Sequence, residues 1–545
     1  MAVITTYLPI VVGIALLIRL LMVGRRPKNY PPGPPTIPIL GNLHLMPTKD
    51  VHLQFEKWAR EYGPVYSLIL GTKVMVVLSS DSAVKDLLDK KSNMYSHRQE
   101  MYIGQTLCSG DMRILMMPYT PKWRTCRKLA HALLNVSSAK SYVPYQMLEN
   151  KQMLYEMITK PDEFLYNIRR YSNALTTTMV YGWRTPTYND EKMQQLFDGF
   201  SEFAEINQTG MAALIDFFPI LRYLPDFFLP ARKKAKELHK KELGLYKGHW
   251  LKAKEDTLKG TITHCFCEDV VPVQKKEGFT DDEAAYIAGT LLEAGSDTTS
   301  STLYGFVQAM VLYPEVQRKA QEELDRVVGS DRLPTMDDEP NLQYIRAIVK
   351  ESLRWMPTTI MGAVPHAVTQ DDYYNGYLIP ANAGVVNNAW AINHDPVRAP
   401  EPRKFKPERY MDDKLSLADS AANPDPSKRD QFTFGAGRRL CPGIHIAERS
   451  LFLGVSRMLW GFNIAPKIGE DGKEIIPDQE KLTQGFVCMP EEYPATISPR
   501  DEKRKKMMEE EWFAAERECL DPETKQWKQG LNWVPKLTST TSTKD

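Results

Sequence analysis

The chain has 545 residues, of which 43% are hydrophobic and 25% charged, and its 69 basic residues nearly balance its 68 acidic residues. This composition indicates a globular protein with a large core and excludes a disordered chain or a small disulfide scaffold. The net charge of +1 gives no basic excess for binding nucleic acid, and seven scattered cysteines indicate a reducing compartment. Length alone suggests about three or four domains, but no linker or internal repeat divides the interior.

The first segment is almost wholly apolar and is expected to cross a membrane. Residues 3–23 carry one charge, Arg19, and match the ~20 residues that a helix needs to span a bilayer. Basic residues at 25–28 follow this run, so the positive-inside rule places the rest of the chain in the cytosol. A cleaved signal peptide is the alternative, but its charge would precede the apolar run. We therefore expect a transmembrane anchor over residues 1–24.

Two outer segments flank the interior of the chain. Residues 25–36 are basic and rich in proline, which stiffens the backbone and cannot continue a helix. Residues 501–545 are charged and end in a serine- and threonine-rich run, without the apolar period of a packed element. We expect a hinge in the first segment and a peripheral or disordered tail in the second.

A long helix is expected in the second half of the chain. Thr280 and Glu283 form a capping box, and helix-compatible sequence continues to Tyr313. Such a helix would span about 50 Å and cross the core. Small and polar residues at 294–299 interrupt its apolar pattern, so Asp297 and the neighbouring hydroxyls could deliver protons at a local groove. Taken alone, the interruption is explained better by a kink or a satisfied core threonine.

A charged lock is expected further on. Glu351 and Arg354 stand three residues apart and share one face of a predicted helix, which in isolation is a common surface pair. Arg409, within Pro407-Glu408-Arg409-Tyr410, offers a second guanidinium that could bind a buried Glu351. The expected role is structural, because losing one member of a buried network leaves a charge unpaired.

The most informative segment is the glycine-rich loop of residues 434–443, which contains Cys441 and leads into a run with helical apolar spacing. Backbone N–H groups and the helix dipole there would stabilise a thiolate, with Pro442 in the first helical turn. The glycines allow close approach of a flat group, and Arg439 offers a cation to an anionic edge. These features together describe a haem site, and a buried structural cysteine is the alternative.

This loop resembles the cysteine-ligand loop of the cytochrome P-450 superfamily. The pattern Phe-x-x-Gly-x-Arg-x-Cys-x-Gly is matched by Phe434, Gly437, Arg439, Cys441 and Gly443. The family's oxygen-activating motif is matched at Ala294, Gly295, Asp297, Thr298 and Thr299, its Glu-x-x-Arg at Glu351 and Arg354, and its Pro-Glu-Arg at residues 407–409. The resemblance extends from the hinge to about residue 500 and implies one mainly α-helical domain with small β-sheets, over residues 37–500.

The resemblance also implies roles for single residues. Cys441 would be the axial ligand of haem b, Thr298 the hydrogen-bonding hydroxyl for oxygen activation, and Asp297 the proton relay. The residues expected to contact the haem or its propionates are Arg98, Trp123, Arg127, Ala294, His366, Phe434 and Arg439. Tyr410 replaces the family's usual Phe, and Asn382 stands where Gly is frequent, although Asn tolerates a left-handed backbone.

The implied activity is a monooxygenase that hydroxylates or epoxidises a small lipophilic substrate. The chain is most similar to microsomal fungal enzymes of secondary metabolism, which suggests a polyketide-derived aromatic. No dinucleotide-binding glycine motif is evident, so electrons are expected from an NADPH-dependent cytochrome P-450 reductase, with cytochrome b5 as a further donor. The expected location is the endoplasmic reticulum membrane, as a single-pass protein with its catalytic domain in the cytosol.

Several surfaces are assigned by the same resemblance. The substrate pocket would draw on residues 101–117, 291–294 and 358–363, and residues 211–230 would form either a membrane-facing entrance or plain core. A reductase could dock on basic residues near the haem-binding segments, although these are equally well explained as solvated surface charge. These basic residues are Lys122, Arg124, Lys128 and Arg438.

Three other functions remain open at this point. A haem-thiolate isomerase or dehydratase would need no reductase and often lacks the pair that Asp297 and Thr298 supply here. A haem sensor or carrier would need neither that pair nor a substrate channel. A zinc site at His264, Cys265 and Cys267 lacks a second ligand pair at suitable spacing.

Overall fold

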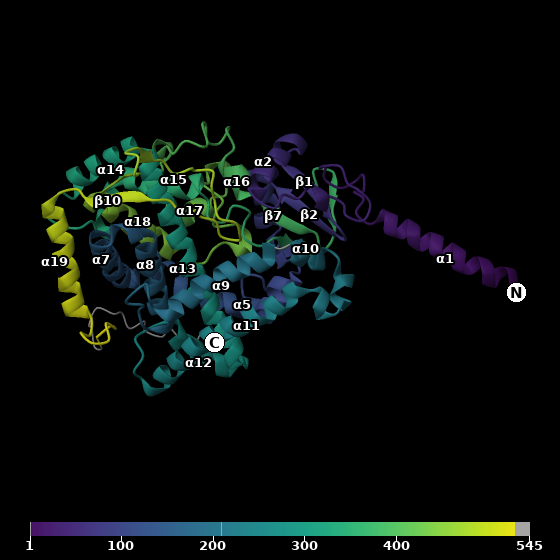
Figure 1. Ribbon diagram of the computed structural model, residues 1–545, viewed down its shortest axis with the longest axis horizontal. Coiled ribbons are helices and arrows are strands. Elements are labelled where there is room, and N and C mark those ends of the chain that lie inside the picture. The colour runs from purple at the N-terminus through teal and green to yellow at the C-terminus, as the bar shows by residue number, and fades with distance from the viewer. Residues whose placement is uncertain (1, 209, 529–545) are drawn as a thin grey trace.

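The computed structural model describes residues 2–208 and 210–528, and it is built mainly of helices with small sheets, of which one lies near α1 and another near α19 (Figure 1). The helices are α1 (Ala2–Met22), α2 (Val51–Tyr62), α3 (Asp81–Val84), α4 (Ser92–Tyr95), α5 (Pro121–Leu134), α6 (Val136–Ser141), α7 (Val143–Thr159), α8 (Phe164–Tyr181), α9 (Glu191–Gln208), α10 (Gly210–Phe217), α11 (Pro230–Lys259), α12 (Phe266–Glu277), α13 (Asp281–Leu312), α14 (Pro314–Val327), α15 (Gln343–Trp355), α16 (Ala389–Asn393), α17 (Leu417–Ala421), α18 (Ile444–Gly461) and α19 (Glu502–Cys519). The strands are β1 (Val65–Leu70), β2 (Lys73–Leu78), β3 (His97–Arg98), β4 (His366–Ala367), β5 (Asp372–Tyr374), β6 (Tyr377–Ile379), β7 (Gly384–Asn387), β8 (Phe462–Ile468), β9 (Glu474–Ile475) and β10 (Ala495–Pro499). The expected mainly α-helical class is confirmed.

The long helix α13 runs through the middle of the body and packs against α8, α11 and α18 (Figure 1). Its predicted capping box is present, since the Thr280 hydroxyl accepts the Glu283 N–H at 3.1 Å and the Glu283 carboxylate accepts the Thr280 N–H at 2.8 Å. Both ends of the helix are buried, at residues 284–290 and 300–311. The expectation that it crosses the core is confirmed.

The largest sheet of the described residues has the strand order β1-β2-β7-β4-β3. Strands β2 and β7 are parallel, and the other neighbouring strands are antiparallel. In the β3–β4 pair, Arg98 lies opposite His366, so the sheet register brings together two residues that are 268 positions apart. Asn382, two residues before β7, has φ of 64°, which confirms that an asparagine carries the left-handed turn here.

The proline-rich segment is folded against the body. The Arg26 guanidinium donates hydrogen bonds to the carbonyl oxygens of Gly33 and Ser67, both at 2.8 Å, and of Pro34 at 2.9 Å. A Cβ atom on Gly33 would lie 2.2 Å from the Ser67 carbonyl oxygen. Burial lowers the pKa of Arg26. Arg26 therefore fastens the segment to β1.

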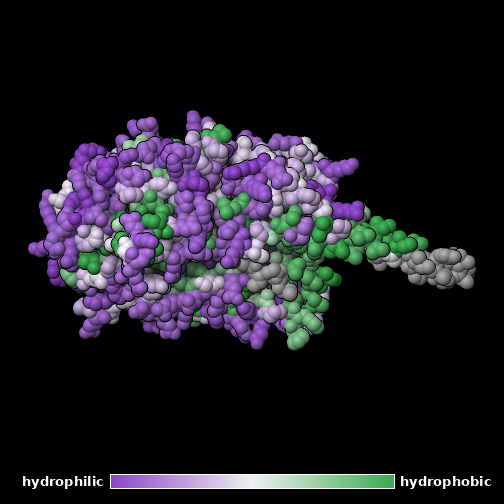
Figure 2. Space-filling model, turned by 45° about the horizontal axis from the view of Figure 1, so that its top comes forward, coloured by the Kyte–Doolittle hydropathy of each residue, from purple (hydrophilic) through white to green (hydrophobic). Residues whose placement is uncertain are grey.

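Helix α1 projects from the body, and the described side chains of its second half are exposed and apolar, as Figures 1 and 2 show. Within the residues searched, which are those that the structure describes, no helix has the length and apolarity needed to cross a membrane. The side chains of residues 1–10 and 16, which include part of the apolar run, lie outside that description. The expected transmembrane anchor over residues 1–24 is not supported by this finding.

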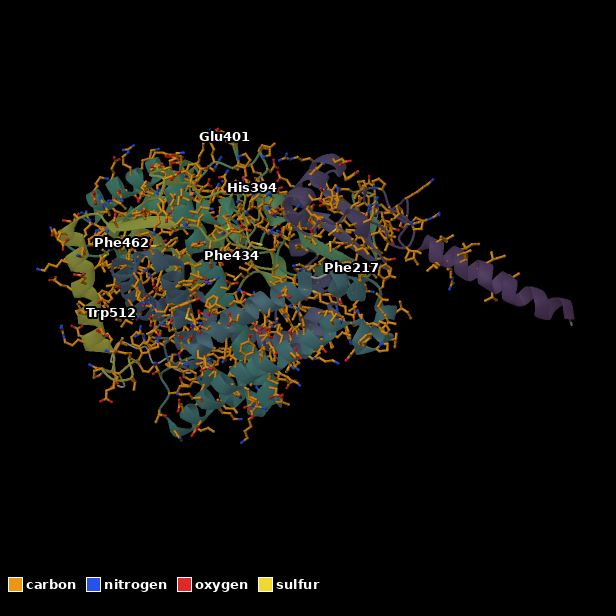
Figure 3. All side chains as sticks on the ribbon, in the orientation of Figure 1. Phe217, His394, Glu401, Phe434, Phe462 and Trp512 are labelled. Carbon is orange, nitrogen blue, oxygen red and sulfur yellow. The ribbon has the colours of Figure 1, made fainter. Side chains whose placement is uncertain are left out.

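The C-terminal segment differs from the expected tail. Helix α19 begins at the N-cap Asp501, and Met508, Trp512 and Ala515 form a buried stripe at helical spacing that the many charges conceal in the sequence. Figure 3 shows Trp512 at the edge of the body. Arg504 anchors the helix to Asp325 at 2.7 Å, and Trp527 is also buried. Residues 501–528 are thus peripheral but ordered, and residues 529–545 lie outside the described residues.

Candidate active site

Cys441 is held by the loop that precedes α18. Its N–H donates to the Phe434 carbonyl oxygen at 2.9 Å, which closes the loop, and the partly buried Phe434, labelled in Figure 3, packs against the hydrophobic core. Gly437 has φ of 62°, and a Cβ atom there would lie 2.0 Å from the Leu88 carbonyl oxygen, so only glycine fits. Helix α18 begins at Ile444. Pro442 therefore lies in the preceding turn, and its expected place in the first helical turn is wrong.

The Cys441 thiol is partly accessible and is subject to opposing influences. Burial raises its pKa, while the Gly443 N–H and the Arg127 guanidinium lower it by smaller amounts. The backbone therefore supports a thiolate, as expected, but burial prevails over that support. A coordinated metal ion would displace the proton, because metal-bound thiols are deprotonated outright.

Three arginines and one histidine from separate segments come together at this loop. The Arg439 guanidinium lies 4.0 Å from the centre of the Trp123 ring and donates to the carbonyl oxygens of Ser96 at 3.0 Å and Met117 at 2.7 Å. Arg127, one helical turn after Trp123 in α5, donates to the Leu440 carbonyl oxygen.

The strand pair β3–β4 supplies the remaining two members of this group. Arg98 donates to the carbonyl oxygens of Leu115, at 3.1 Å, and Val364. His366 makes a 2.7 Å hydrogen bond from Nδ1 to the Tyr95 carbonyl oxygen. The structure thus brings together Arg98, Trp123, Arg127, His366, Arg439 and Cys441, all expected from the sequence to surround one group.

The guanidiniums of Arg98, Arg127 and Arg439 have no carboxylate partner. Burial lowers the pKa of Arg439, and the charges of Arg98 and Arg127 lower it further. The pKa of His366 is lowered by burial and by Arg98 and Arg439. No ion pair joins any of these groups to an acidic side chain among the described residues. Clustered, partly buried cations without a counter-ion are costly, so the arrangement fits a ligand with acidic groups, such as the propionates of haem b.

The polar interruption of α13 is more accessible than the buried stretches on either side of it. Ala294 is exposed, although the helix is buried on both sides of residues 291–299. The Thr298 hydroxyl donates to the Ala294 carbonyl oxygen at 2.8 Å, and the Asp297 carboxylate accepts from Ser301 at 3.4 Å. Burial raises the pKa of Asp297 to about 6. An acid that exchanges its proton near neutrality therefore stands beside a hydroxyl group.

The expected lock residues are in contact. The Glu351 carboxylate is fully buried and accepts two hydrogen bonds from Arg354, both at 2.7 Å. It also accepts the Lys406 N–H at 2.8 Å, and Arg409 approaches it at 3.4 Å. Arg354 further donates to the Pro402 carbonyl oxygen at 2.8 Å. The network fastens α15 to the segment that leads toward the cysteine loop.

Four functional candidates were not identified from the sequence. Arg113 binds the carboxylates of Glu242 and Glu293, and Tyr246 donates to Glu293. A signal was present, because Glu293 stands one helical turn before Asp297, and Arg113 is the only basic residue in the mainly apolar segment of residues 101–117. These residues come from three separate segments, so only the fold could join them.

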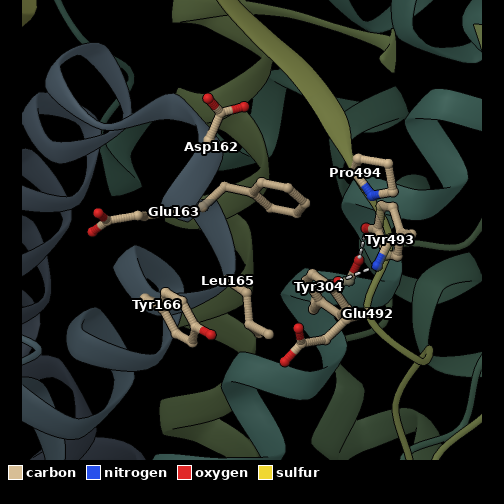
Figure 4. A pocket seen from close by; sticks show the side chains of 9 residues that line it. Asp162, Glu163, Leu165, Tyr166, Tyr304, Glu492, Tyr493 and Pro494 are labelled. Carbon is tan, nitrogen blue, oxygen red and sulfur yellow. Dashed lines mark hydrogen bonds between the residues drawn. The ribbon is translucent and has the colours of Figure 1, made fainter. Parts of the chain in front are cut away.

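Two other candidate sites share no residue with the group around Cys441. His264 pairs with Glu268 at 2.7 Å, and no group of three metal-ligating side chains is found in the part of the chain that the structure describes. A surface cavity of about 310 Å³ lies beside α8 and β10 (Figure 4). Its lining includes Tyr304 and Tyr493, whose hydroxyl donates to the Tyr304 carbonyl oxygen at 2.7 Å, but none of the expected site residues.

A cysteine on a glycine-rich loop among unpaired arginines, in a chain whose long core helix carries an acid next to a hydroxyl, is typical of a haem-thiolate protein. The family model for cytochrome P450 matches residues 31–496. The chain therefore belongs to the cytochrome P450 family.

Three fungal relatives match almost the full length. The chain is 52% identical to the cytochrome P450 monooxygenase virE of Hypocrea virens, over 94% of each chain. It is 49% identical to fogE of Aspergillus ruber, over 95% of this chain and 96% of the relative. It is 47% identical to fsoB of Humicola fuscoatra, over 95% of each chain. Both are also named cytochrome P450 monooxygenases, so the chain is an oxidoreductase of this class.

Proposed function

We propose that this monooxygenase holds haem b through the Cys441 thiolate, with its propionates among Arg98, Trp123, Arg127, His366 and Arg439. The observation that carries the proposal is the cluster of three guanidiniums beside Cys441 without a carboxylate partner. Ala294 and Phe434 would contact the faces of the ring. Glu351, Arg354 and Arg409 would keep the cysteine loop in place without touching the haem.

Haem with a thiolate ligand supplies oxygen activation when it is bound. The chain's own contribution is proton handling at the exposed turn of α13. The Thr298 hydroxyl, which donates to the Ala294 carbonyl oxygen in this structure, would turn its hydrogen bond toward the haem pocket, and Asp297 would hold the proton that is delivered next. The presence of both residues favours oxygenation over the isomerase or dehydratase alternative.

The proposed substrate is a small lipophilic molecule of the polyketide-derived aromatic kind, which is hydroxylated or epoxidised. Support comes from the similarity to fungal monooxygenases and from the apolar character of the segments expected to line the substrate pocket. In the cluster beside η3 (Tyr102–Leu107), Ile103, Met116, Phe203 and Val364 are buried together. Such a lining would orient a flat, apolar substrate by shape and exclude water.

The proposed electron donors are an NADPH-dependent cytochrome P450 reductase and cytochrome b5. Arg124 and Lys128 on α5 and Arg438 on the cysteine loop are exposed. Lys122 is also exposed, and its ammonium group forms an ion pair with Glu283. An exposed basic face above a redox site would steer an acidic partner toward it.

We also propose that the protein is attached to the endoplasmic reticulum membrane, with its catalytic domain in the cytosol. Exposed apolar side chains on η5 (Pro219–Tyr223) and η6 (Asp226–Phe228) include Ile220, Phe227 and Phe228. Figure 2 shows hydrophobic surface gathered where α1 joins the body. Such a patch suits a membrane surface. Retention in the membrane pellet after a high-salt wash would support this placement, and release would contradict it.

The reduced, CO-bound absorption spectrum tests the haem assignment. The full-length protein should show the spectrum of a thiolate-ligated haem, because Cys441 is the proposed axial ligand. Cys441→Ser should abolish that spectrum, whereas Cys519→Ser, which changes a partly exposed cysteine on α19, should keep it. A globin-like band in the folded native protein would refute thiolate ligation by Cys441.

A further inference from the structure

A buried charged cluster joins α11, α13 and the segment between η3 and α5. Arg113, between η3 and α5, donates to Glu242 of α11 at 2.6 Å and to Glu293 of α13. Tyr246 of α11 donates its hydroxyl hydrogen to the same Glu293 carboxylate. The side chains of Arg113 and Glu242 are 6% exposed, and that of Glu293 is 11% exposed. One guanidinium thus faces two carboxylates, so one additional proton on the cluster would balance its charge.

The Glu242 carboxyl can carry that proton near neutral pH. Burial raises its pKa to about 7, Arg113 lowers it, and the charge of Glu293 raises it further. The other titratable or charged groups around this cluster are Glu202, Tyr246, Tyr286 and Cys108. Since the pKa lies near the pH of the cytosol, this cluster binds and releases a proton without a large energetic penalty.

The outer side of the cluster opens on a cavity. A cavity of about 350 Å³ between α9 and α11 is lined by both Glu242 and Tyr246. Its wall also carries the charged residues Asp198, Glu202 and Lys241. A space of this size with several polar groups holds water molecules. The Tyr246 side chain therefore borders the cavity and also hydrogen-bonds to Glu293.

The inner side of the cluster leads toward Asp297. Glu293 lies one helical turn before Asp297, and its charge is one of the influences that raise the pKa of Asp297. Ala294, which lies between them in the sequence, is exposed. A Cβ atom on Gly289 would lie 2.4 Å from the Tyr246 ring, so glycine allows the ring to lie directly on α13. The close contact directs the Tyr246 hydroxyl to Glu293.

We propose that Tyr246 and Glu293 relay protons from the cavity between α9 and α11 to Asp297, with Arg113 and Glu242 as positioning residues. Water in the cavity gives a proton to the Tyr246 oxygen while the Tyr246 O–H proton passes to Glu293. The proton on Glu293 then passes through water to the Asp297 carboxylate, and bulk solvent returns a proton to the cavity. No charge is gained or lost by Tyr246. The inference rests on the proposed use of Asp297 in oxygen activation.

The test uses full-length holoenzyme with purified NADPH-dependent reductase, and it needs no substrate. Tyr246→Phe removes only the relaying hydroxyl, and Glu293→Gln removes the carboxylate. Tyr286→Phe is the matched control, because its hydroxyl contacts His239 at 2.7 Å and no carboxylate. The measured quantity is the share of consumed dioxygen that is released as hydrogen peroxide, in water and in deuterium oxide.

Both relay variants should shift dioxygen consumption toward peroxide, with water formation reduced on the order of tenfold, because proton delivery becomes slower. Tyr286→Phe should match the native protein. In infrared titrations of the full-length protein, Glu293→Gln should also lower the pKa of Glu242 and of Asp297, because the charge of Glu293 raises both.

A native peroxide share in both relay variants would overturn the relay, as would an equal change in Tyr286→Phe. Each variant must show the reduced, CO-bound spectrum of thiolate-ligated haem. If the native protein lacks that spectrum, the proposed function fails. If all variants have the spectrum but do not differ in peroxide release, only the relay fails.

Discussion

Replacing Glu351 by Gln should destabilise the fold far more than the same change in an exposed ion pair. The Glu351 carboxylate is fully buried and is the partner of Arg354, which is 2% exposed. Gln keeps the shape of the side chain but carries no charge, so the Arg354 guanidinium loses its counter-ion inside the core. An unpaired buried charge of this kind costs about 3 to 5 kcal/mol.

The expected shift in melting temperature follows from the size of the chain. With about 2.1 cal/mol/K of unfolding entropy per residue, 545 residues give about 1.1 kcal/mol/K, so Tm should fall by about 3 to 4 °C. Thermal unfolding followed by circular dichroism measures this fall. Glu322→Gln is the matched control, because Glu322 and its partner Arg318 are more than 60% exposed, and it should change stability by less than about 1 kcal/mol. Equal shifts in the two variants would refute a buried charged lock.

Two further predictions concern the exposed turn of α13. Thr298→Ala should leave the reduced, CO-bound spectrum intact but divert NADPH electrons from product to peroxide, and unchanged coupling would contradict the role of the hydroxyl. Asp297→Asn should stabilise the fold at pH 7.5 by up to about 3 kcal/mol. The reason is that the folded-state pKa of about 6 lies above the ordinary value of 3.8, so stability contributed by the protonated acid is lost as the pH rises through 6. Urea unfolding should show this gain shrinking toward pH 4, and a gain that does not depend on pH would contradict the raised pKa.

Local patterns determined much of what could be predicted. The capping box at Thr280, the helical spacing of Glu351 and Arg354, and the glycine-rich loop around Cys441 each depend on neighbours within a few residues. Their structural consequences follow from backbone geometry and helix periodicity. The position of Asn382 in a left-handed turn was predictable for the same reason. Features of this kind can be recognised from a short window of the sequence.

Sequence reasoning missed other features because it relied on the mean composition of a segment. Residues 501–528 are highly charged, and this concealed the stripe of Met508, Trp512 and Ala515 that packs α19 onto the body. The basic residues at 25–28 indicated only the flank of an anchor, whereas Arg26 binds backbone carbonyl groups of Gly33 and Ser67. In both cases a few specific contacts outweigh the mean composition.

The sequence by itself determined the chemistry of the site, because a cysteine on that loop and an acid next to a hydroxyl in a core helix are local features. Only the tertiary structure decided what surrounds them. Arg98 meets His366 through strand register, and Arg113 meets Glu242 and Glu293 where three elements cross. Such meetings depend on contacts between segments more than 100 residues apart, and a single sequence carries no local record of them. The unpaired cations and the shared proton are therefore properties of the fold.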